Sequence, residues 1–518
     1  MTIHQAIAAP AVEAERPGVS VPSLRFFGQD FTASIVVFLV AMPLCMGIAV
    51  ASGVPPEKGL ITGIIGGIVV GMLAGSPLQV SGPAAGLAVI VFELVRDQGL
   101  SALGPILILA GAIQVAAGVF RVGGWFRAIS PAVVHGMLAG IGVLIVVGQF
   151  HVLFDGKPLP TGLDNLAAMP GRLLGLSPGN IEAAERAFAI GLLTIAAMIG
   201  WEKYRPQSLR LIPGALVGVL LGTFAAILLG LDVTKVVVPE SIAAAVDLPD
   251  AGILARFADP AIITAAFAIA FIASAETLLS AAAVDRMHGG VRTDYNKELR
   301  AQGVGNLLCG AAGSLPMTGV IVRSSANVQA GAMTRLSTIL HGVWILGFVA
   351  LLPWLLREIP MATLAAVLVV TGWRLVNLTH VKHLFKGYGL LPALIWAATL
   401  TTVVAFDLLT GVLVGIALTL LELIPHLTRL RLRVDRSDGP SGSDIRLGGA
   451  ATFVTLPRLA QMLDSVPSSE PVRLDVSGLH KLDHTTSEML RDWLARRRAG
   501  GSATEVMGAR GPTASVAS

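Results

Sequence analysis

The chain has 518 residues, of which 54% are hydrophobic and 14% are charged. Soluble domains carry about 25% charged residues, so the composition is typical of a membrane protein and argues against a soluble enzyme. The net charge of +4 is spread along the chain without a basic run or an aromatic-interleaved patch, which argues against nucleic-acid binding.

Long apolar segments, each sufficient or nearly sufficient for the roughly 20 residues of a membrane-spanning helix, follow one another from residue 31. They lie near 31–50, 59–74, 102–120, 130–150, 187–200, 211–230, 261–283, 300–314, 334–355, 361–379, 388–406 and 408–425. Two further segments are short and Gly/Pro-headed: Gly82–Leu94, which opens with GPAAG, and Gly319–Gly331, which follows PMT. Together they predict about fourteen spans.

The two short segments are the third and the tenth, at matching places in two sets of seven. Short, interrupted spans in matching positions indicate a binding site near the membrane midplane. Because seven is odd, the two sets must be inverted with respect to each other. With a cytoplasmic N-terminus, the short cytoplasmic loops carry clustered Lys and Arg, as the positive-inside rule requires.

The composition changes at about Arg429, where a charged, Ser/Gly-rich stretch begins. The following sequence predicts a small α/β domain with strands near 444–447 and 472–478 and helices near 456–464 and 486–499. The expected domains are therefore an N-terminal cytoplasmic segment (1–30), a transmembrane domain (31–428), a cytoplasmic α/β domain (429–505) and a disordered tail (506–518).

The starts of the two short segments form the first candidate site. In QVSGPAAG (Gln79–Gly86) and LPMTGVIVR (Leu315–Arg323), proline and glycine stand where a helix would begin inside the membrane domain. Facing helix starts would offer free N–H donors and positive dipole ends to one anion. The small residues Ala84, Ala85, Gly86 and Gly319 permit close approach, and Arg323 adds charge. Alternatively, the small residues only permit helix packing.

Glu276 forms the second candidate site, because an ionisable group within an apolar span is costly to bury. It could bind a coupling proton, or a sodium ion with Ser280 one turn away and Thr277 beside it. The alternative is a structural carboxylate that caps the tenth segment or pairs with Arg323.

Other chemistry has little support in the sequence. Cys45 and Cys309 both lie in apolar runs, and there is no HExxH or Walker-type motif. We therefore expect no cofactor, no catalytic residues and no ATP-driven pump.

Several stretches resemble the SulP (sulfate permease) family of inorganic anion transporters. They are MPLCMGIAVASGVPPEKGLITGIIGG (Met42–Gly67), QVSGPAAG, AETLLSAAAVDRMHGG (Ala275–Gly290), NKELRAQGVGNLLCG (Asn296–Gly310), PMTGVIVRSSANVQAGAMT (Pro316–Thr334) and VRLDVSGLHKLDHTTSEML (Val472–Leu490). The last resembles the STAS domain of these transporters, although His484 follows Asp483 where a phosphorylatable hydroxyl is common.

The resemblance implies two inverted seven-helix repeats arranged as core and gate domains, a cytoplasmic STAS domain for dimer contact or regulation, and a homodimer in a bacterial inner membrane with both termini cytoplasmic. It places the anion between the third and tenth helices, with the first helix at one side. The residues it nominates are Leu44, Ile48, Ala84, Ala85, Gly319, Val320, Ile321, Val322 and Arg323.

The chain departs from the family at two places. Many members have hydroxyl residues in a pattern like TGSFSR, where this chain has Val320 and Val322. Sodium-coupled bicarbonate transporters similar to this chain carry Asp at the position of Glu276 and Thr at that of Ser280. These departures leave open the identity of the anion and the choice between proton and sodium.

We expect a secondary active transporter of sulfate or bicarbonate that works by an elevator-like movement. The alternatives are an uncoupled anion exchanger or channel on the same fold, and a membrane-anchored regulator in which the STAS domain signals.

Overall fold

The computed structural model describes most of the chain. The described residues are 24–126, 130–175, 181–209, 211–237, 242–248, 253–285, 287–376, 390–423, 432–439, 442–452, 455–467, 470–499 and 502–508. Most of the expected N-terminal segment, the expected domain boundary at residue 429 and the tail from residue 509 lie outside them. The chain forms two compact units: one comprises Met1–Phe120, Ile141–Val376 and Val404–Leu408, and the other Arg121–Gly140, Asn377–Val403 and Leu409–Ser518.

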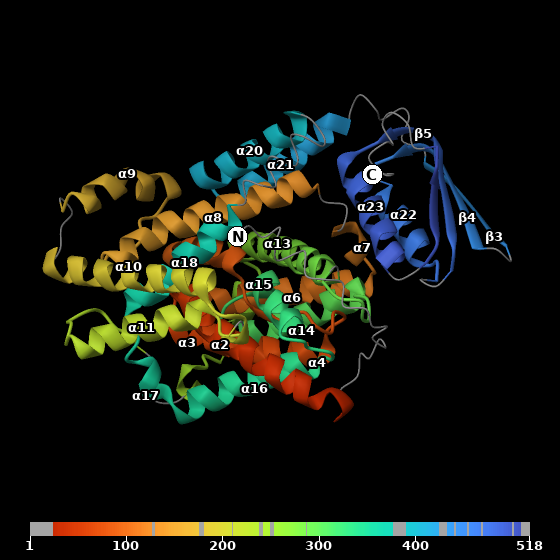
Figure 1. Ribbon diagram of the computed structural model, residues 1–518. Coiled ribbons are helices and arrows are strands. Elements are labelled where there is room, and N and C mark those ends of the chain that lie inside the picture. The colour runs from red at the N-terminus through yellow and green to blue at the C-terminus, as the bar shows by residue number, and fades with distance from the viewer. Residues whose placement is uncertain are drawn as a thin grey trace. The chain divides into compact units, whose positions relative to one another are not determined.

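The helices follow the predicted order of two sets of seven membrane segments (Figure 1). The first set is α2 (Phe27–Ala51), α3 with η2 and α4 (Pro56–Leu73), η3 (Ala85–Leu87) with α5 (Ala88–Gln98), η4 with α6 (Leu100–Val119), α8 (Pro131–Leu153), α10 (Ile181–Tyr204) and α11 (Gly214–Leu228). The second is α13 (Pro260–Asp285), α14 (Tyr295–Ala311), α15 (Ile321–Gln329), α16 (Leu336–Leu351), α18 (Met361–Leu375), α20 (Leu390–Ala405) and α21 (Leu408–Leu423).

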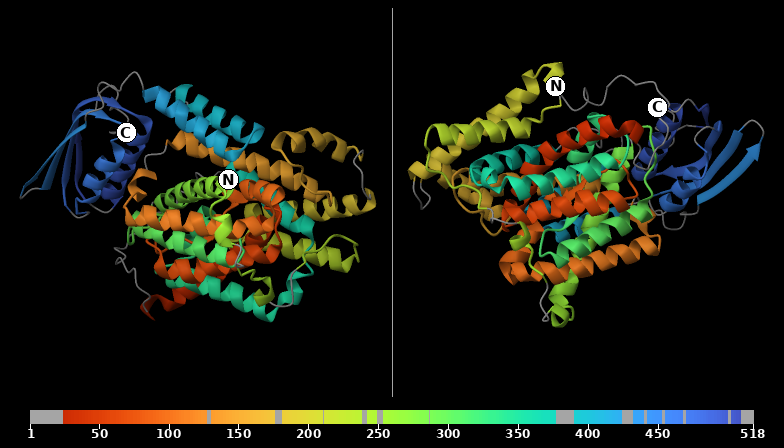
Figure 2. Two further views of the ribbon diagram at one scale, coloured as in Figure 1. Left: turned by 180° about the vertical axis from the view of Figure 1, so that it is seen from behind. Right: turned by 90° about the horizontal axis from the view of Figure 1, so that it is seen from below.

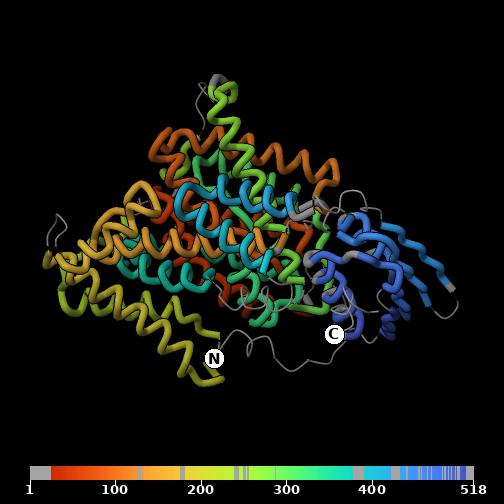
Figure 3. The backbone as a smooth tube through the Cα atoms, turned by 90° about the horizontal axis from the view of Figure 1, so that it is seen from above, coloured from red at the N-terminus to blue at the C-terminus, as the bar shows by residue number. Residues whose placement is uncertain are grey.

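Shorter helices join these segments. They are η1 (Leu24–Phe26), α7 (Gly123–Phe126), α9 (Gly162–Leu173), η5 (Gln207–Leu209), η6 (Ile242–Ala245), α12 (Ile253–Arg256) and α17 (Pro353–Leu356). The trace in Figure 3 shows α10 and α11 side by side, in agreement with their direct packing.

Some helices begin earlier than the apolar runs predict. The run from residue 300 predicts the ninth span, but α14 begins at Tyr295 because the Asp294 carboxylate accepts hydrogen bonds from the N–H groups of Asn296 and Lys297, both at 3.0 Å. Such a side-chain cap satisfies the free donors of a first turn, so polar residues can start the helix.

Glycines allow helices of the two sets to cross at close range. A Cβ on Gly111 of α6 would lie 2.6 Å from the backbone oxygen of Gly303 in α14, and a Cβ on Gly67 in η2 would lie 2.6 Å from Cα of Gly342 in α16. The second segment of each set thus packs on the fourth segment of the other. This reciprocal packing is what two inverted repeats produce.

Two short strands meet inside the first unit. β1 (Ser81–Pro83) pairs antiparallel with β2 (Met317–Gly319), and the register places Gly82 opposite Thr318. Each strand directly precedes one of the two half-length helices, so this pairing brings the third and tenth segments together over a separation of more than 200 residues.

The C-terminal part of the second unit is a small α/β domain, as the sequence predicts. Its elements are β3 (Leu432–Gly439), β4 (Gly442–Ala451), α22 (Leu456–Asp464), β5 (Val472–Leu482), α23 (His484–Ala499) and β6 (Thr504–Met507). The sheet order is β3-β4-β5-β6, with β3 antiparallel to β4 and the other pairs parallel. Helices α22 and α23 cover one face, as the two views of Figure 2 show. Leu447, Leu474, Leu463 and Trp493 form part of its buried core.

Two strands of this domain differ from the prediction. In the charged stretch that contains β3, only Leu432 and Val434 pack on the core. Two alternating apolar residues are too few to predict a strand from the sequence. At the other end, residue 506 was expected to begin a disordered tail, but Val506 and Met507 pair with Leu474 and Asp475. A four-residue edge strand carries too few apolar side chains to stand out from a Gly/Ala/Ser-rich tail.

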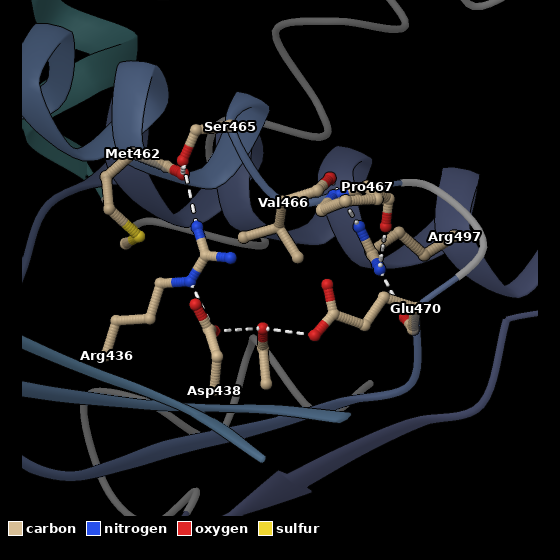
Figure 4. Close-up of polar contacts among 9 residues, drawn as sticks. Arg436, Asp438, Met462, Ser465, Val466, Pro467, Glu470 and Arg497 are labelled. Atoms are coloured by element: carbon tan, nitrogen blue, oxygen red, sulfur yellow. Dashed lines mark hydrogen bonds and ion pairs between the residues drawn. The ribbon is translucent and has the colours of Figure 1, made fainter. Parts of the chain in front are cut away.

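Arg497 of α23 fixes the connection between α22 and β5 (Figure 4). Its guanidinium group donates hydrogen bonds to the backbone oxygens of Val466, at 3.2 Å, Pro467, at 2.8 Å, and Glu470. The same group lies 4.9 Å from the ring centre of Trp493. A buried side chain thus binds three backbone acceptors of this connection. Two of them also accept a second hydrogen bond: the Pro467 oxygen from the Glu470 N–H at 3.2 Å, and the Glu470 oxygen from the Ser502 hydroxyl at 2.8 Å.

The glycine crossing of α6 and α14 should tolerate no side chain. In Gly303→Ala the new Cβ would lie 2.6 Å from the backbone nitrogen of Val115 and 2.7 Å from the oxygen of Gly111. Overpacking against backbone costs about 1–3 kcal/mol, so the thermal midpoint of the purified protein should fall by several degrees. Gly347→Ala, on α16 with nothing within 4 Å, is the control and should leave the midpoint unchanged. Equal midpoints for the two variants would contradict the close crossing.

Candidate functional site

The two candidate stretches meet at the β1–β2 pair. Beyond the pairing itself, the N–H of Val320 donates to the backbone oxygen of Val80 at 2.9 Å, and the N–H of Ala84 donates to that of Pro316 at 3.3 Å. The Ser324 hydroxyl on α15 accepts a hydrogen bond from the Val80 N–H at 2.9 Å. The starts of η3 and α15 are therefore held together by the backbone of both stretches.

Neither helix start is capped by the side chain of the residue that precedes it. The residues before them, Ala84 and Val320, have extended backbone conformations and no side-chain hydrogen bond to the helix. The first N–H groups of a helix lack partners within the helix, and its dipole favours a negative charge at this end. The crossing thus supplies the arrangement expected for an anion site built from backbone.

Glu276 of α13 lies at this crossing. Its carboxyl group faces the Thr318 hydroxyl and the backbone N–H of Gly86. A Cβ on Gly86 would lie 2.8 Å from Oε2 and 2.9 Å from Oε1 of Glu276. Among the described residues, Oε2 of Glu276 and Oγ1 of Thr318 have no partner with good hydrogen-bond geometry. The carboxyl group therefore stands at the start of the third segment, with an oxygen free for a further ligand.

Thr277, predicted as a coupling-ion residue beside Glu276, makes two hydrogen bonds at the crossing. Its hydroxyl accepts a hydrogen bond from the N–H of Gly319 at 3.1 Å, and its backbone oxygen accepts one from Nε2 of Gln79 at 3.0 Å. Thr277 thus ties α13 to both strands. Ser280 is buried one turn further along α13.

Gln79, which the sequence motifs do not nominate, is a further candidate site residue at the crossing. Its side chain packs directly over Gly319, where a Cβ would collide with the amide group. Gln79 is only 2% exposed, and its Oε1 has no partner among the described residues. Gln79 is the first residue of the candidate stretch QVSGPAAG, so its position in the sequence points to the site. A polar residue before a Gly/Pro stretch is also typical of an ordinary loop, however, and the sequence alone does not distinguish the two.

Arg323 is completely buried, at 0% exposure, and its guanidinium group packs against Gly82, where a Cβ would collide with it. The Cys45 thiol and His341 lie beside it. Within the described part of the chain, none of the three guanidinium nitrogens has a hydrogen-bond partner. The pairing with Glu276 that the sequence left open is therefore not formed.

The remaining nominated residues are apolar or small. On α2, which packs against β1, α5 and α15, Leu44 and Ile48 are buried, and Leu44 belongs to a large hydrophobic cluster. At the start of α15, Ile321 and Val322 are 37% and 42% exposed. Ala84 and Gly86 are buried at the third segment, and Ala85 is partly exposed. The polar contribution to the site thus comes from the backbone, Glu276, Thr318, Gln79 and Arg323.

No metal cluster is built into the described residues, because they contain no group of three or more His, Cys, Asp or Glu side chains with suitable placement.

Residues 27–399 match the sequence profile of the sulfate permease family. The chain belongs to this family. It is 29% identical to YvdB of Bacillus subtilis, whose name assigns it to the sulfate transporters, over 92% of this chain and 90% of that protein. The family consists of membrane transporters, so the chain is a multi-pass transporter and not an enzyme.

Solved structures confirm the fold. The transmembrane domain of a cyanobacterial bicarbonate transporter, BicA, is 24% identical with a TM-score of 0.63, and the match covers 76% of this chain and 99% of that domain. The structure of SLC26A9 is 15% identical with a TM-score of 0.67, and the match covers 95% of this chain and 86% of that protein. The second match extends over the C-terminal α/β domain as well.

The contact between Gly86 and Glu276 predicts a specific loss and rescue. Gly86→Ala should raise the KM of anion uptake about tenfold or more, because the new Cβ pushes the carboxyl group out of place. Adding Glu276→Asp, which withdraws the carboxyl group by one methylene, should recover part of the affinity. Gly289→Ala, with nothing within 4 Å, is the control and should behave like the parent protein. Unchanged uptake by Gly86→Ala would show that the anion binds elsewhere.

Proposed function

We propose that the protein is a secondary active transporter that carries a small inorganic oxyanion, sulfate or bicarbonate, bound between the starts of η3 and α15. One observation carries the proposal: two helix starts that their own preceding residues leave uncapped meet through the β1–β2 pair, close to a buried guanidinium group that has no hydrogen-bond partner among the described residues. An oxyanion accepts several hydrogen bonds at once, so it suits converging N–H donors better than a halide does.

Arg323 supports an anionic substrate on energetic grounds. An uncompensated buried charge is destabilising by several kcal/mol, and among the described residues no carboxylate neutralises Arg323. A bound anion nearby would offset that cost. Arg323 thus acts as an electrostatic partner of the substrate, while the backbone of both helix starts makes the direct contacts.

Glu276 is the proposed coupling residue. Within the described parts of the chain, its Oε2 is buried without a hydrogen-bond partner, as are Oγ1 of Thr318 and Oε1 of Gln79. A proton on Glu276 would remove the charge beside the anion, and a sodium ion bound by Glu276 and Ser280 would balance it. The carboxylate and the anion are both negative and both favour the start of η3. Anion binding would therefore depend on whether Glu276 holds the proton or the sodium ion, and so on the gradient of that ion.

The apolar side chains of Val320, Ile321 and Val322 leave recognition to the backbone. Where many family members have hydroxyl groups, this chain offers Val320 and Val322, and Val322 is partly exposed. Backbone donors fix the geometry of an anion but select weakly between tetrahedral and planar oxyanions. The names of relatives support both: YvdB is named for sulfate and BicA for bicarbonate.

Membership of the family supports four further parts of the proposal. We propose an elevator-like movement of a core domain past a gate domain, a homodimer, and a bacterial inner-membrane location with cytoplasmic termini. The C-terminal domain, with its STAS-like sequence, would serve dimer contact or regulation. An uncoupled exchanger or channel is the alternative, although Glu276 and Arg323 do not neutralise each other as that alternative supposes.

Uptake into proteoliposomes tests coupling. Labelled sulfate and bicarbonate are supplied with an imposed proton or sodium gradient, for the parent protein and for Glu276→Gln. We expect one gradient to drive accumulation of one anion, and Glu276→Gln to transport without responding to that gradient. Uptake that ignores both gradients in the parent protein, and survives the substitution unchanged, would establish an exchanger or channel.

Arg323→Gln tests the electrostatic role. Removal of the buried charge should raise the KM for the anion more than about tenfold, since a charge in a desolvated site contributes above 1.4 kcal/mol. Arg186→Gln is the matched control: Arg186 on α10 donates to Oε2 of Glu182 at 2.8 Å in an exposed position, and its loss should change KM less than about twofold. Equal effects of the two substitutions would contradict a specific role for Arg323.

A further inference from the structure

One face of α14 carries three buried polar side chains at four-residue spacing. Glu298, Gln302 and Asn306 are each 0% exposed, and residues four apart lie on the same side of a helix. All three belong to the stretch NKELRAQGVGNLLCG, which contributes no residue to the candidate site described above. We call these three residues the α14 ladder.

Asn306 binds the backbone of β2. Its Oδ1 accepts a hydrogen bond from the Met317 N–H at 2.8 Å, and its Nδ2 donates to the Met317 oxygen at 3.2 Å. The side-chain amide thus binds both the backbone N–H and the backbone oxygen of Met317, as a neighbouring strand would. Met317 lies four residues before the start of α15, so Asn306 fixes the approach to that helix start.

Gln302 and Glu298 hold the other strand. Nε2 of Gln302 donates to the Ser81 hydroxyl of β1 at 2.6 Å and to Oε1 of Glu298 at 3.0 Å. Oε2 of Glu298 accepts a hydrogen bond from the N–H of Ser76, in the segment that leads to β1, at 2.9 Å. A single helix face therefore supports both strands of the crossing.

The ladder is itself braced by two other helices. Nδ2 of Asn306 also donates to Oε1 of Gln114 on α6 at 2.7 Å. Nε2 of Gln114 in turn donates to the Ser274 hydroxyl on α13 at 3.2 Å. Ser274 lies two residues before Glu276, so the hydrogen-bonded chain connects β2 with the helix that bears the proposed coupling residue.

We propose that the α14 ladder positions the two helix starts for the anion, and that Asn306 is a positioning residue of the site. This inference rests on the proposed function, because it concerns the same site. The physical reason is that backbone donors bind an anion well only when they converge on it. Two three-residue strands are too short to hold that geometry by their own pairing. The α14 ladder supplies further hydrogen-bond partners to both strands.

Asn306→Ala tests the proposal, with Leu299→Ala as the matched control. Leu299 lies on the same helix and is also 0% exposed, but its side chain is apolar. Uptake is measured per folded transporter as a function of anion concentration. We expect Asn306→Ala to raise KM about five- to tenfold, the effect of losing one or two hydrogen bonds. Leu299→Ala should lower the thermal midpoint and leave KM unchanged.

Gln114→Leu provides a second variant that keeps Asn306 in place, for use also if Asn306→Ala does not fold. Gln114→Leu should also raise KM, but by less than Asn306→Ala does. The double variant Gln114→Leu/Asn306→Ala should have a KM close to that of Asn306→Ala alone, because Gln114 acts through Asn306. A KM that stays at the parent value in both variants, or that rises equally in Leu299→Ala, would overturn the positioning role.

Hydrogen exchange of residues 314–320 separates this proposal from the proposed function, since it needs no substrate. Asn306→Ala should speed exchange at these amides, whereas Leu299→Ala should not. Unchanged exchange would overturn the ladder itself. Failure of the parent protein to transport sulfate or bicarbonate would contradict the proposed function and leave the exchange experiment intact.

Discussion

The pairing of β1 with β2 is the constraint on which the rest of the membrane domain depends. Half-length helices leave non-helical backbone at membrane depth, which is tolerated only where protein or a polar cavity satisfies it. Ser81 pairs with Gly319, Gly82 with Thr318 and Pro83 with Met317, so each interrupted segment satisfies the other. The same pairing turns two helix starts toward one place. The proposed anion site thus follows from the way in which the chain satisfies its own backbone.

The buried charges at this crossing follow from the same arrangement. Arg323 packs where Gly82 has no side chain, and Glu276 packs where Gly86 has none. The two groups remain unpaired with each other, although each would lower the cost of burying the other. A structure that holds an acidic and a basic side chain apart in its interior leaves each of them available to a mobile ion. Such an arrangement suits a transporter better than a static scaffold.

The sequence predicted the order of the spans and both short segments, because hydropathy and Gly/Pro content report directly on membrane crossing. It could not predict the strand register at the crossing, since three-residue strands have no periodicity and their partners are far apart in the chain. Glu276 and Arg323 were both recognised, but their separation was not, because it depends on how Gly82 and Gly86 pack. Gln79 was missed for a related reason: only its contact with Gly319 distinguishes it from a loop residue. That these residues bind an anion remains a prediction.

The central claim is that the anion lies between the starts of η3 and α15. Crystals of the protein with selenate, a sulfate analogue whose selenium scatters anomalously, would locate it most directly. We expect an anomalous peak within hydrogen-bonding distance of the backbone N–H groups at both helix starts, close to Gly86 and Ile321. Selenate that inhibits uptake but gives its peak at another place, or that contacts only one of the two helix starts, would contradict it.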